Sequence, residues 1–357
     1  MNLYQLLASG FPKDKQACAI ETHDGLYYSW DDLERATAKM ANLLASLKLP
    51  KDSRVAVQVE KSPEALFLYL ATLRAGLVYL PLNTAYQGAE IEYFLGNAEP
   101  AVVVCSPKNY DWVSKLAKNA GTKRVFTLGE DRNGTLLDEA AIYSDRFKTV
   151  KKTDNDLAAI LYTSGTTGRS KGAMLTHGNL GSNAKVLQKF WGWQQGDVLL
   201  HALPIFHVHG LFVASHGALL NGSKMIWLPR LDTKQLIKHM PRSTVMMGVP
   251  TFYVRLLLDS DFTKAVTKNM RLFISGSAPL LTETFNSFQE KTGHTILERY
   301  GMSETVMLVS NPYKGARIGG SVGLPLPQTQ VRVVKEDGVL CKVNEIGNVE
   351  VKGPNVF

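Results

Sequence analysis

Short, continuously apolar runs recur along the first part of the chain and are separated by longer amphipathic segments. Such runs are typical of parallel strands that helices cover on both faces. We predict strands at 54–59, 101–105 and 124–128, and helices at 62–76, 89–99 and 112–121. This alternation indicates an α/β unit, which we place at residues 1–150.

The helix predicted at 62–76 has start and stop signals at its two ends. Ser62 can cap its N-terminus, and Pro63 suits its first turn. Glu64 favours the positive end of the helix dipole, and Gly76 can end the helix. These signals predict that the helix begins and ends within this segment.

A second alternating block follows a more polar segment, and we expect it to form a second α/β unit at 151–325. Two similar blocks indicate a pseudo-duplicated layout, although the sequence shows no repeat. From 326 to 357 the pattern alternates with a period of two around Asp337 and Gly338, which predicts β-hairpins. The strands predicted in the second block lie at 158–163, 198–203, 224–229, 244–249, 271–276 and 295–301, and its helices at 232–240, 251–260 and 281–293.

The composition allows a large core and limits the classes of partner. The chain has 357 residues, of which 45% are apolar and 20% charged, so more than one folding unit is expected and disorder is not. The net charge of +8 makes nucleic acid the first partner to consider. The lysines and arginines are scattered, however, without a basic arm or an aromatic RNA-binding signature. We therefore interpret the charge as a solvated basic surface and expect no nucleic-acid partner.

The cysteines and the lack of long apolar runs indicate where in the cell the protein is located. Cys18, Cys105 and Cys341 are far apart and form no CxxC pair. This argues against a disulfide framework or a zinc site and favours a reducing cytoplasm. The N-terminal residues do not resemble a signal peptide, and no apolar run is long enough to span a bilayer, so we expect no membrane partner. The oligomeric state is not predicted.

The most distinctive polar stretch is YTSGTTGRSKG at 162–172, which follows a predicted strand. Its glycines allow close approach of the backbone, its N–H and hydroxyl groups can donate to phosphate oxygens, and Lys171 adds positive charge. It is not a Walker A loop, because Ser170 precedes the lysine and Gly172 follows it. An ordinary flexible turn is the alternative, but the composition favours a phosphate-binding loop.

Four stretches together resemble the motifs of adenylate-forming enzymes, the family of acyl-CoA synthetases, luciferases and peptide-synthetase adenylation domains. The resemblance covers nearly the whole chain, and its nearest branch is that of the malonyl-CoA synthetases. It implies the large N-terminal domain of an α/β fold, with two stacked subdomains whose sheets are covered by helices, a partial β-barrel at 326–357 and no C-terminal lid domain. The motifs are YTSGTTGRSKGAMLTHGNL at 162–180, ALPIFHVHGL at 202–211, SGSAPL at 275–280 and ERYGMSET at 298–305.

In this family a carboxylate attacks the α-phosphate of ATP, and coenzyme A then takes the acyl group. The resemblance therefore implies ATP, Mg²⁺, coenzyme A and a small carboxylic acid as ligands. It implies Mg²⁺ at Thr163 and Glu304, whose oxygens suit a hard cation, although Glu304 alone would be interpreted as a surface carboxylate. The residues implied to hold the β- and γ-phosphates are Ser164, Gly165, Thr166, Thr167, Gly168 and Lys171.

Two of the motifs are implied to surround the adenine and the α-phosphate. Tyr300 would stack on adenine, although alone it would be interpreted as a core aromatic. Thr305 would contact the α-phosphate region. The other residues implied to contact the nucleotide are Gly276, Ser277, Ala278, Pro279, Glu298, Arg299, Gly301, Met302 and Ser303.

The sequence contains a group of histidines that could be mistaken for a metal site. The resemblance makes His207 a gate beside the acyl site, so the implied catalytic set is His207, Lys171 and Glu304. For His201 and His216 we expect a core or hydrogen-bonding role, and His209 completes the group. No cysteine accompanies these histidines, and we expect no zinc.

Two arginines predict the class of acid. Arg255 lies on a largely apolar predicted helix and Arg299 directly precedes Tyr300, so each would be costly if buried without a partner. Internal acidic partners are an alternative for each alone. In malonyl-CoA synthetases the matching arginines bind the distal carboxylate of the substrate, which a guanidinium suits. The pair therefore predicts a short dicarboxylic acid, malonate. Substrate contacts are also expected from His207, Ser277, Val208 and Met307, the last two beside C2 of the acid.

The sequence ends before the family's ribose-binding aspartate and lid lysine. We expect a truncated part of a longer enzyme, which binds ATP·Mg²⁺ but forms the adenylate slowly. The predicted function is an ATP-dependent malonate–CoA ligase. A generic short- or medium-chain acyl-CoA synthetase and a non-catalytic nucleotide- or acyl-binding fragment are the alternatives.

Overall fold

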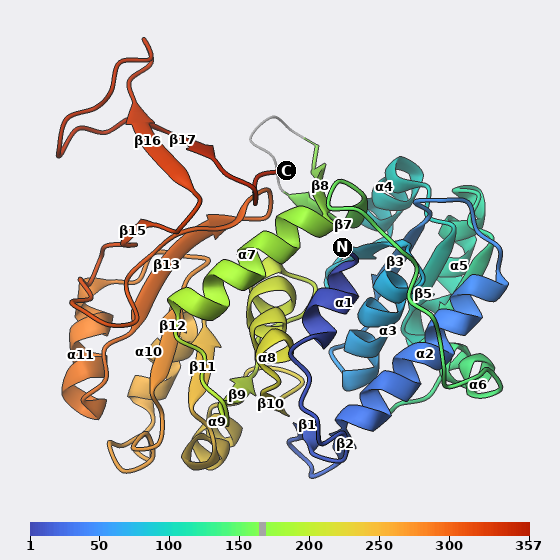
Figure 1. Ribbon diagram of the computed structural model, residues 1–357, viewed down its shortest axis with the longest axis horizontal. Coiled ribbons are helices and arrows are strands. Elements are labelled where there is room, and N and C mark those ends of the chain that lie inside the picture. The colour runs from blue at the N-terminus through green and yellow to red at the C-terminus, as the bar shows by residue number, and fades with distance from the viewer. Residues whose placement is uncertain (164–168) are drawn as a thin grey trace.

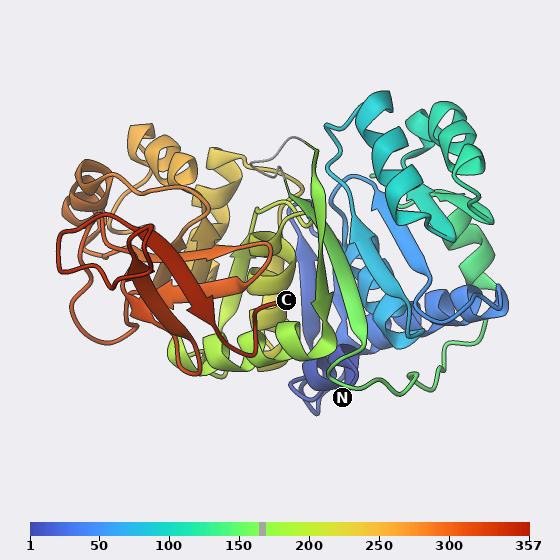
Figure 2. The same cartoon turned by 90° about the horizontal axis from the view of Figure 1, so that it is seen from above.

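Two α/β units lie side by side in the computed structural model, which describes residues 1–163 and 169–357 (Figure 1). Within these residues, a six-stranded sheet forms the first unit and a nine-stranded sheet the second. A two-stranded sheet lies over the far end of the second unit (Figure 2). The expected α/β fold is confirmed.

The first sheet has the strand order β6-β5-β3-β4-β7-β8, with every neighbouring pair parallel except β7 and β8. Alternate residues face opposite sides, so Val55 and Val57 join one hydrophobic core and Ala56 joins another. Helices α2, α3 and α6 cover the first face, and α4 and α5 cover the second. The elements are β3 (Arg54–Gln58), β4 (Val78–Pro81), β5 (Val102–Cys105), β6 (Arg124–Thr127), β7 (Leu157–Thr163), β8 (Lys171–Thr176), α2 (Trp30–Ser46), α3 (Pro63–Arg74), α4 (Gly88–Ala98), α5 (Tyr110–Asn119) and α6 (Thr135–Ala141).

The second sheet has the order β15-β14-β13-β12-β11-β9-β10-β1-β2. Its central strands are parallel, and the pairs at its two edges are antiparallel. Its strands are β1 (Cys18–Thr22), β2 (Tyr27–Ser29), β9 (Val198–His201), β10 (Lys224–Trp227), β11 (Val245–Gly248), β12 (Leu272–Ser275), β13 (Leu297–Met302), β14 (Val306–Ser310) and β15 (Leu324–Pro325). The accompanying helices are α1 (Leu3–Ala8), α7 (His177–Phe190), the π-helix η2 (His209–Ser215), α8 (His216–Asn221), α9 (Thr233–His239), α10 (Pro250–Leu258) and α11 (Thr282–Thr292).

Helix α3 joins the two units through one continuous core. Ser62 caps it by accepting a hydrogen bond from the Ala65 N–H at 3.1 Å, and the helix ends at Arg74, as its signals predict. All 12 of its residues are buried, because it lies between the first sheet and helices of the second unit. Tyr69 shows this contact, since its ring lies 5.8 Å from that of Phe212 in η2.

The predicted subdomain boundaries do not follow the division of strands between the sheets. Strands β1 and β2, from the first 150 residues, join the second sheet, where Ile20 pairs with Met225. Strands β7 and β8, from beyond residue 150, complete the first sheet, where Ala159 pairs with Tyr79. The boundary at 150 stays a prediction about the chain and does not coincide with the division of strands. Strand pairing depends on which backbone edges meet in space, and local apolar patterns do not contain that information.

The end of the chain forms a hairpin, as predicted, but with a different turn. Strands β16 (Gln330–Val334) and β17 (Asn348–Lys352) are antiparallel, with Arg332 opposite Glu350. The predicted turn at Asp337 and Gly338 closes a smaller bridge between Val334 and Leu340. The residues between that bridge and β17 form a longer connection.

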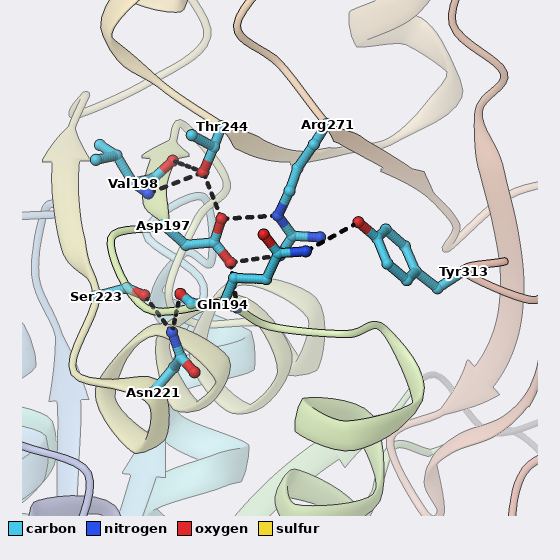
Figure 3. A network of polar contacts seen from close by, with 8 residues as sticks. All are labelled: Gln194, Asp197, Val198, Asn221, Ser223, Thr244, Arg271 and Tyr313. Carbon is cyan, nitrogen blue, oxygen red and sulfur yellow. Dashed lines mark hydrogen bonds and ion pairs between the residues drawn. The ribbon is translucent and has the colours of Figure 1, made fainter.

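A buried polar network fixes the beginnings of three neighbouring strands (Figure 3). Asp197 precedes β9, Thr244 precedes β11 and Arg271 precedes β12. The Nε of Arg271 donates to Oδ1 of Asp197 at 2.7 Å, and Oγ1 of Thr244 donates to the same oxygen at 2.8 Å. The backbone N–H of Gln194 donates to Oδ2 at 2.7 Å. The network therefore aligns the amino ends of these parallel strands with one another, and so fixes where their carboxyl ends lie.

We expect Asp197→Ala to lower the free energy of unfolding by about 3–5 kcal/mol, because it leaves the Arg271 guanidinium buried without its carboxylate. Urea unfolding followed by circular dichroism measures this change. The control is Arg332→Ala, which removes an exposed pair with Glu350 and should cost less than about 1 kcal/mol. Equal effects of the two substitutions would contradict a structural role for the network.

Candidate active site

A cavity of about 410 Å³ opens at the carboxyl ends of the second sheet's parallel strands. Ligands of open α/β sheets bind at this edge, because the loops that follow the strands converge there. The walls come from the loop after β9, the residues after β11 and β12, and the β13–β14 hairpin. The lining residues are Leu203, Pro204, His207, Val208, His209, Gly210, Val249, Ser277, Arg299, Gly301, Met302, Ser303 and Met307.

The β13–β14 hairpin that carries ERYGMSET has a strained and tightly packed backbone. Val306 adopts φ 55°, a left-handed conformation that β-branched residues rarely occupy. A side chain at Gly301 has no room, because its Cβ would lie 1.8 Å from the carbonyl oxygen of Val306. The ladder shifts register between Tyr300 and Gly301. Strain of this kind is found at ligand sites, where the surrounding structure maintains it.

Arg299 is the main charged group of the cavity wall. Its side chain is buried, with 2% exposure, and its Nε and Nη2 have no hydrogen-bond partner among the described residues. Burial lowers the pKa of Arg299 to about 9, so the guanidinium is still charged at neutral pH. Gly276 makes room for it, since a Cβ there would lie 2.4 Å from Cζ of Arg299. The cavity therefore contains a desolvated positive charge with no carboxylate partner among residues 1–163 and 169–357.

The residues expected to hold adenine form an open surface beside the cavity. Tyr300 is 38% exposed, and Ser277, Ala278 and Pro279 are also exposed, although Gly276 beneath them is buried. A half-exposed aromatic ring with a neighbouring loop can stack on a purine from one side. Ser277 lines the cavity as well and adopts φ 70°.

Glu298 and Thr305 have local bonding roles in the structure. The Leu280 N–H donates to Oε1 of Glu298 at 3.0 Å, and burial raises the pKa of this carboxyl. Glu298 thus holds the end of the SGSAPL loop in place and does not line the cavity. The Met302 N–H donates to Oγ1 of Thr305 at 3.4 Å, within the turn of the hairpin.

Thr163 and Glu304 come from different sheets and meet at the junction between the units. Oγ1 of Thr163, at the end of β7, lies 3.3 Å from Oε1 of Glu304, in the β13–β14 turn. Lys171 pairs with Thr163 across β7 and β8, and its side chain is exposed. Residues 164–168, the rest of the predicted phosphate loop, lie outside the described residues. The hydroxyl and the carboxylate are oxygen ligands of the kind that Mg²⁺ prefers, so this pair fits the implied metal.

Asparagines that the sequence did not single out hold the motif hairpin in place. Nδ2 of Asn355 donates to the carbonyl oxygens of Thr305 at 2.6 Å and Met307 at 3.2 Å. Nδ2 of Asn183, in α7, donates to the Met307 carbonyl oxygen at 2.8 Å. The carbonyl of Glu304 accepts the Phe357 N–H at 3.2 Å. Such long-range contacts leave no local signal in the sequence.

The predicted acid-binding residues divide into those that reach the cavity and one that does not. Val208 and Met307 are buried in its wall, and His207 lines it while remaining exposed. His209, which was not assigned a site role, also lines it, and its Nδ1 lies 3.4 Å from Oγ of Ser277. The HxH spacing of the motif could have pointed to both histidines.

Arg255 lies on α10 with an exposed side chain and is not among the lining residues of the cavity. The structure thus buries Arg299 and leaves Arg255 exposed, and a contact of Arg255 with the acid stays a prediction. Helix α10 turns Phe252, Tyr253 and Leu256 toward the core, which leaves Arg255 on the opposite face.

His201 and His216 have the core hydrogen-bonding roles that were expected. Nε2 of His216 lies 2.8 Å from the hydroxyl of Tyr69, and Nδ1 of His201 lies 3.1 Å from Nζ of Lys61. Burial lowers the pKa of His216 to about 3, so this ring is neutral. Across the described residues, no group of three or more His, Cys, Asp or Glu side chains could hold a metal ion.

No helix among residues 1–163 and 169–357 has the length and apolar character needed to cross a bilayer.

Comparisons with known proteins agree with the fold and with the motifs. The profile of the AMP-binding enzyme family matches residues 7–357. Malonate–CoA ligase of Arabidopsis thaliana is 31% identical over 396 aligned residues, which cover 100% of this chain and 64% of that protein. The mitochondrial malonate–CoA ligase of Mus musculus is 37% identical over 289 residues, which cover 75% of this chain and 48% of that protein. The chain thus spans half to two thirds of the length of these relatives.

The solved structure of a relative has the same fold and a higher sequence identity to this chain. ATP-bound MatB from Rhodopseudomonas palustris superposes with a TM-score of 0.96 and 52% identity, covering 100% of this chain and 71% of that one. A family match over nearly all of the sequence is sufficient for membership. The chain therefore belongs to the AMP-binding enzyme family.

Proposed function

We propose that this chain carries the nucleotide and acid sites of an ATP-dependent acid–CoA ligase, and that the acid is malonate. The observation that carries the choice of acid is the buried guanidinium of Arg299, which has unpartnered nitrogens in the wall of a cavity of about 410 Å³. A monocarboxylate has only the carboxylate that reacts with ATP. A dicarboxylate has a second carboxylate, which can neutralise Arg299.

The proposed reaction has two steps. First, a carboxylate oxygen of malonate attacks the α-phosphorus of ATP, and pyrophosphate leaves. The thiol sulfur of coenzyme A then attacks the acyl carbon of malonyl-adenylate, AMP leaves, and the thiol proton passes to solvent. The protein contributes chiefly positioning and charge neutralisation, because the reacting groups all belong to the substrates.

Five residues have proposed roles in this reaction. Arg299 would bind the distal carboxylate and so direct the other one toward the nucleotide. Tyr300 would stack on the adenine, and Lys171 would neutralise the phosphates from the start of β8. Thr163 and Glu304 would hold Mg²⁺, which lowers the charge repulsion between the phosphates and the attacking carboxylate.

The relatives support the proposal through what they are known to do. Two are malonate–CoA ligases, and the MatB structure contains ATP. We include coenzyme A among the substrates on the same basis. For the compartment we propose the cytoplasm, because Cys18, Cys105 and Cys341 are free thiols. A mouse relative is mitochondrial, so the compartment is tested separately by localising the tagged protein.

Malonate-dependent release of pyrophosphate from ATP is the direct test of this proposal. ATP·Mg²⁺ binding without any acid-dependent release would favour a non-catalytic nucleotide-binding role. Release that is faster with butyrate than with malonate would favour a generic acyl-CoA synthetase.

Lys171→Ala and Glu304→Gln should each weaken binding of ATP·Mg²⁺ while leaving the fold intact. Each removes a charge-assisted contact worth about 1.5–3 kcal/mol, which corresponds to roughly a 10- to 150-fold higher Kd. Isothermal titration calorimetry measures the Kd, and circular dichroism checks the fold. Lys118→Ala, an exposed lysine on α5, is the matched control and should bind normally. Unchanged affinity in both site variants would refute the nucleotide site.

Arg299→Ala should abolish the preference for malonate. A buried polar site can discriminate against analogues that lack the matching group by roughly 10⁴. The measurement is the ratio of kcat/KM for malonate to that for butyrate, and we expect it to collapse through loss of malonate turnover. An unchanged ratio would disprove dicarboxylate recognition by this residue.

Arg255 is retained as a proposed second contact to the distal carboxylate, although its side chain is exposed. If it binds malonate, Arg255→Ala lowers the same ratio without changing the Kd for ATP·Mg²⁺. A ratio equal to that of the wild type would leave Arg299 as the single arginine of the site.

Val208→Ala and Met307→Ala should admit malonates with an alkyl group at C2. Both side chains are buried in the cavity wall, so shortening them creates space beside the proposed acid. The relative kcat/KM for ethylmalonate and malonate should rise in each variant. Met246→Ala, a buried residue of β11 outside the lining, is the control for general loosening of the core. A ratio no higher than that of the control would place the two residues away from C2.

A further inference from the structure

A lysine that the proposed reaction does not use is buried at the junction of the two units. Lys61 follows β3 of the first sheet and is 8% exposed. Its Nζ lies 2.8 Å from the carbonyl oxygen of His201, 2.7 Å from that of Leu228 and 3.1 Å from Nδ1 of His201. It also lies 4.4 Å from the centre of the Trp227 ring. All of these partners belong to the second unit.

The geometry fixes where the protons of this group lie. Nε2 of His201 is 3.0 Å from both the carbonyl oxygen of Gly210 and Oγ of Ser215, and the carbonyl can only accept a hydrogen bond. The ring must therefore carry its proton on Nε2. Since burial lowers the pKa of His201 well below its usual value, the ring is neutral and Nδ1 is an acceptor. Lys61 then donates to three acceptors, one for each N–H of an ammonium group.

Desolvation opposes the charge on Lys61 and lowers its pKa. The three acceptors and the face of Trp227 act in the opposite direction, because each stabilises a cation. The hydrogen bonds to the two carbonyl oxygens remain even for a neutral amine. The contact to Nδ1 matches the tautomer that the Gly210 carbonyl assigns, because Lys61 then donates to a ring nitrogen without a proton.

Gly210 connects this group to the cavity. It lies in the first turn of η2, and its carbonyl oxygen also accepts from Oγ of Ser215 at 2.9 Å. A Cβ at Gly210 would lie 2.0 Å from the carbonyl oxygen of Pro204, so η2 and the loop after β9 are in backbone contact here. Gly210 and Pro204 both line the cavity. A π-helix is a rare element that is frequently found at functional sites.

We propose that Lys61 and His201 are positioning residues that hold the π-helical wall of the acid cavity through the carbonyl of Gly210. Lys61, from the first unit, donates to Nδ1 and holds the ring in place, and His201 in turn donates from Nε2 to the Gly210 carbonyl. The consequence is that the first unit controls the shape of this cavity, although none of its residues in 1–163 and 169–176 lines it. This inference rests on the proposed function only in taking malonate as the ligand of the cavity.

Lys61→Met removes the donors while retaining the length of the side chain. We expect the Kd for malonate, measured by calorimetry in the presence of a non-hydrolysable ATP analogue, to rise by roughly tenfold or more. The Kd for the ATP analogue should stay within about twofold of the wild type, because the nucleotide surface does not touch this group. In turnover assays, the KM for malonate should rise more than kcat falls. Lys152→Met is the control, since the Lys152 side chain is 5% exposed but pairs with Asp52 at 3.1 Å.

A pair of substitutions at His201 tests the proton assignment. His201→Gln keeps an N–H donor near the position of Nε2 and should retain most of the malonate affinity. His201→Leu removes it and should weaken malonate binding as much as Lys61→Met does. A general loss of core packing would affect both variants alike, so the difference between them reports the hydrogen bond to Gly210.

The outcomes separate this inference from the proposed function. If the wild type does not bind malonate, the proposed function fails. If the wild type binds malonate and Lys61→Met binds it equally well, the positioning role is overturned. Equal affinities of His201→Gln and His201→Leu, or an equal loss in Lys152→Met, would overturn it as well. If Lys61→Met does not fold, the comparison of the two His201 variants decides the question.

Discussion

The packing of two sheets against one shared layer of buried helices is the constraint on which the candidate site depends. Helix α3 is buried along its whole length, because it faces its own sheet on one side and the second unit on the other. Tyr69 contacts both Phe212 and His216 across this layer. The units are therefore held in a fixed relation, and Thr163 of the first sheet reaches Glu304 of the second. A nucleotide site at this junction needs that relation to be maintained.

Within the second unit, a backbone constraint produces the chemistry of the cavity. The guanidinium of Arg299 lies against Gly276, where a side chain of any size would displace it. The left-handed Val306 and the packed Gly301 bend the hairpin that carries Arg299, Tyr300 and Glu304. Burial without a carboxylate partner is unfavourable for an arginine in the free protein. Such a cost is expected where a ligand supplies the missing partner, because the protein has then exchanged stability for recognition.

The polar groups in the core serve two separate purposes. The network of Asp197, Thr244 and Arg271 lies at the amino ends of the strands, far along them from the cavity edge, and its carboxylate is neutralised by an arginine within the protein. It aligns the amino ends of the strands without any ligand. Lys61 and His201 lie instead where the units meet and act on the carbonyl of a cavity residue. Buried polar networks of the first kind specify the fold, and those of the second kind shape a site.

The sequence by itself determined the motifs, the family and many of the strands and helices, because these depend on local periodicity, end signals and short spacings. The strands and helices lie close to their predicted positions, and Ser62 caps its helix as expected. Tertiary structure alone decided which strands share a sheet, so β1 and β7 crossed the predicted boundary. It also decided that Arg299 is buried while Arg255 is exposed, since this depends on which face of α10 meets the core. The roles of Gly276, Asn355 and Lys61 come from contacts between residues distant in sequence, which no local pattern encodes.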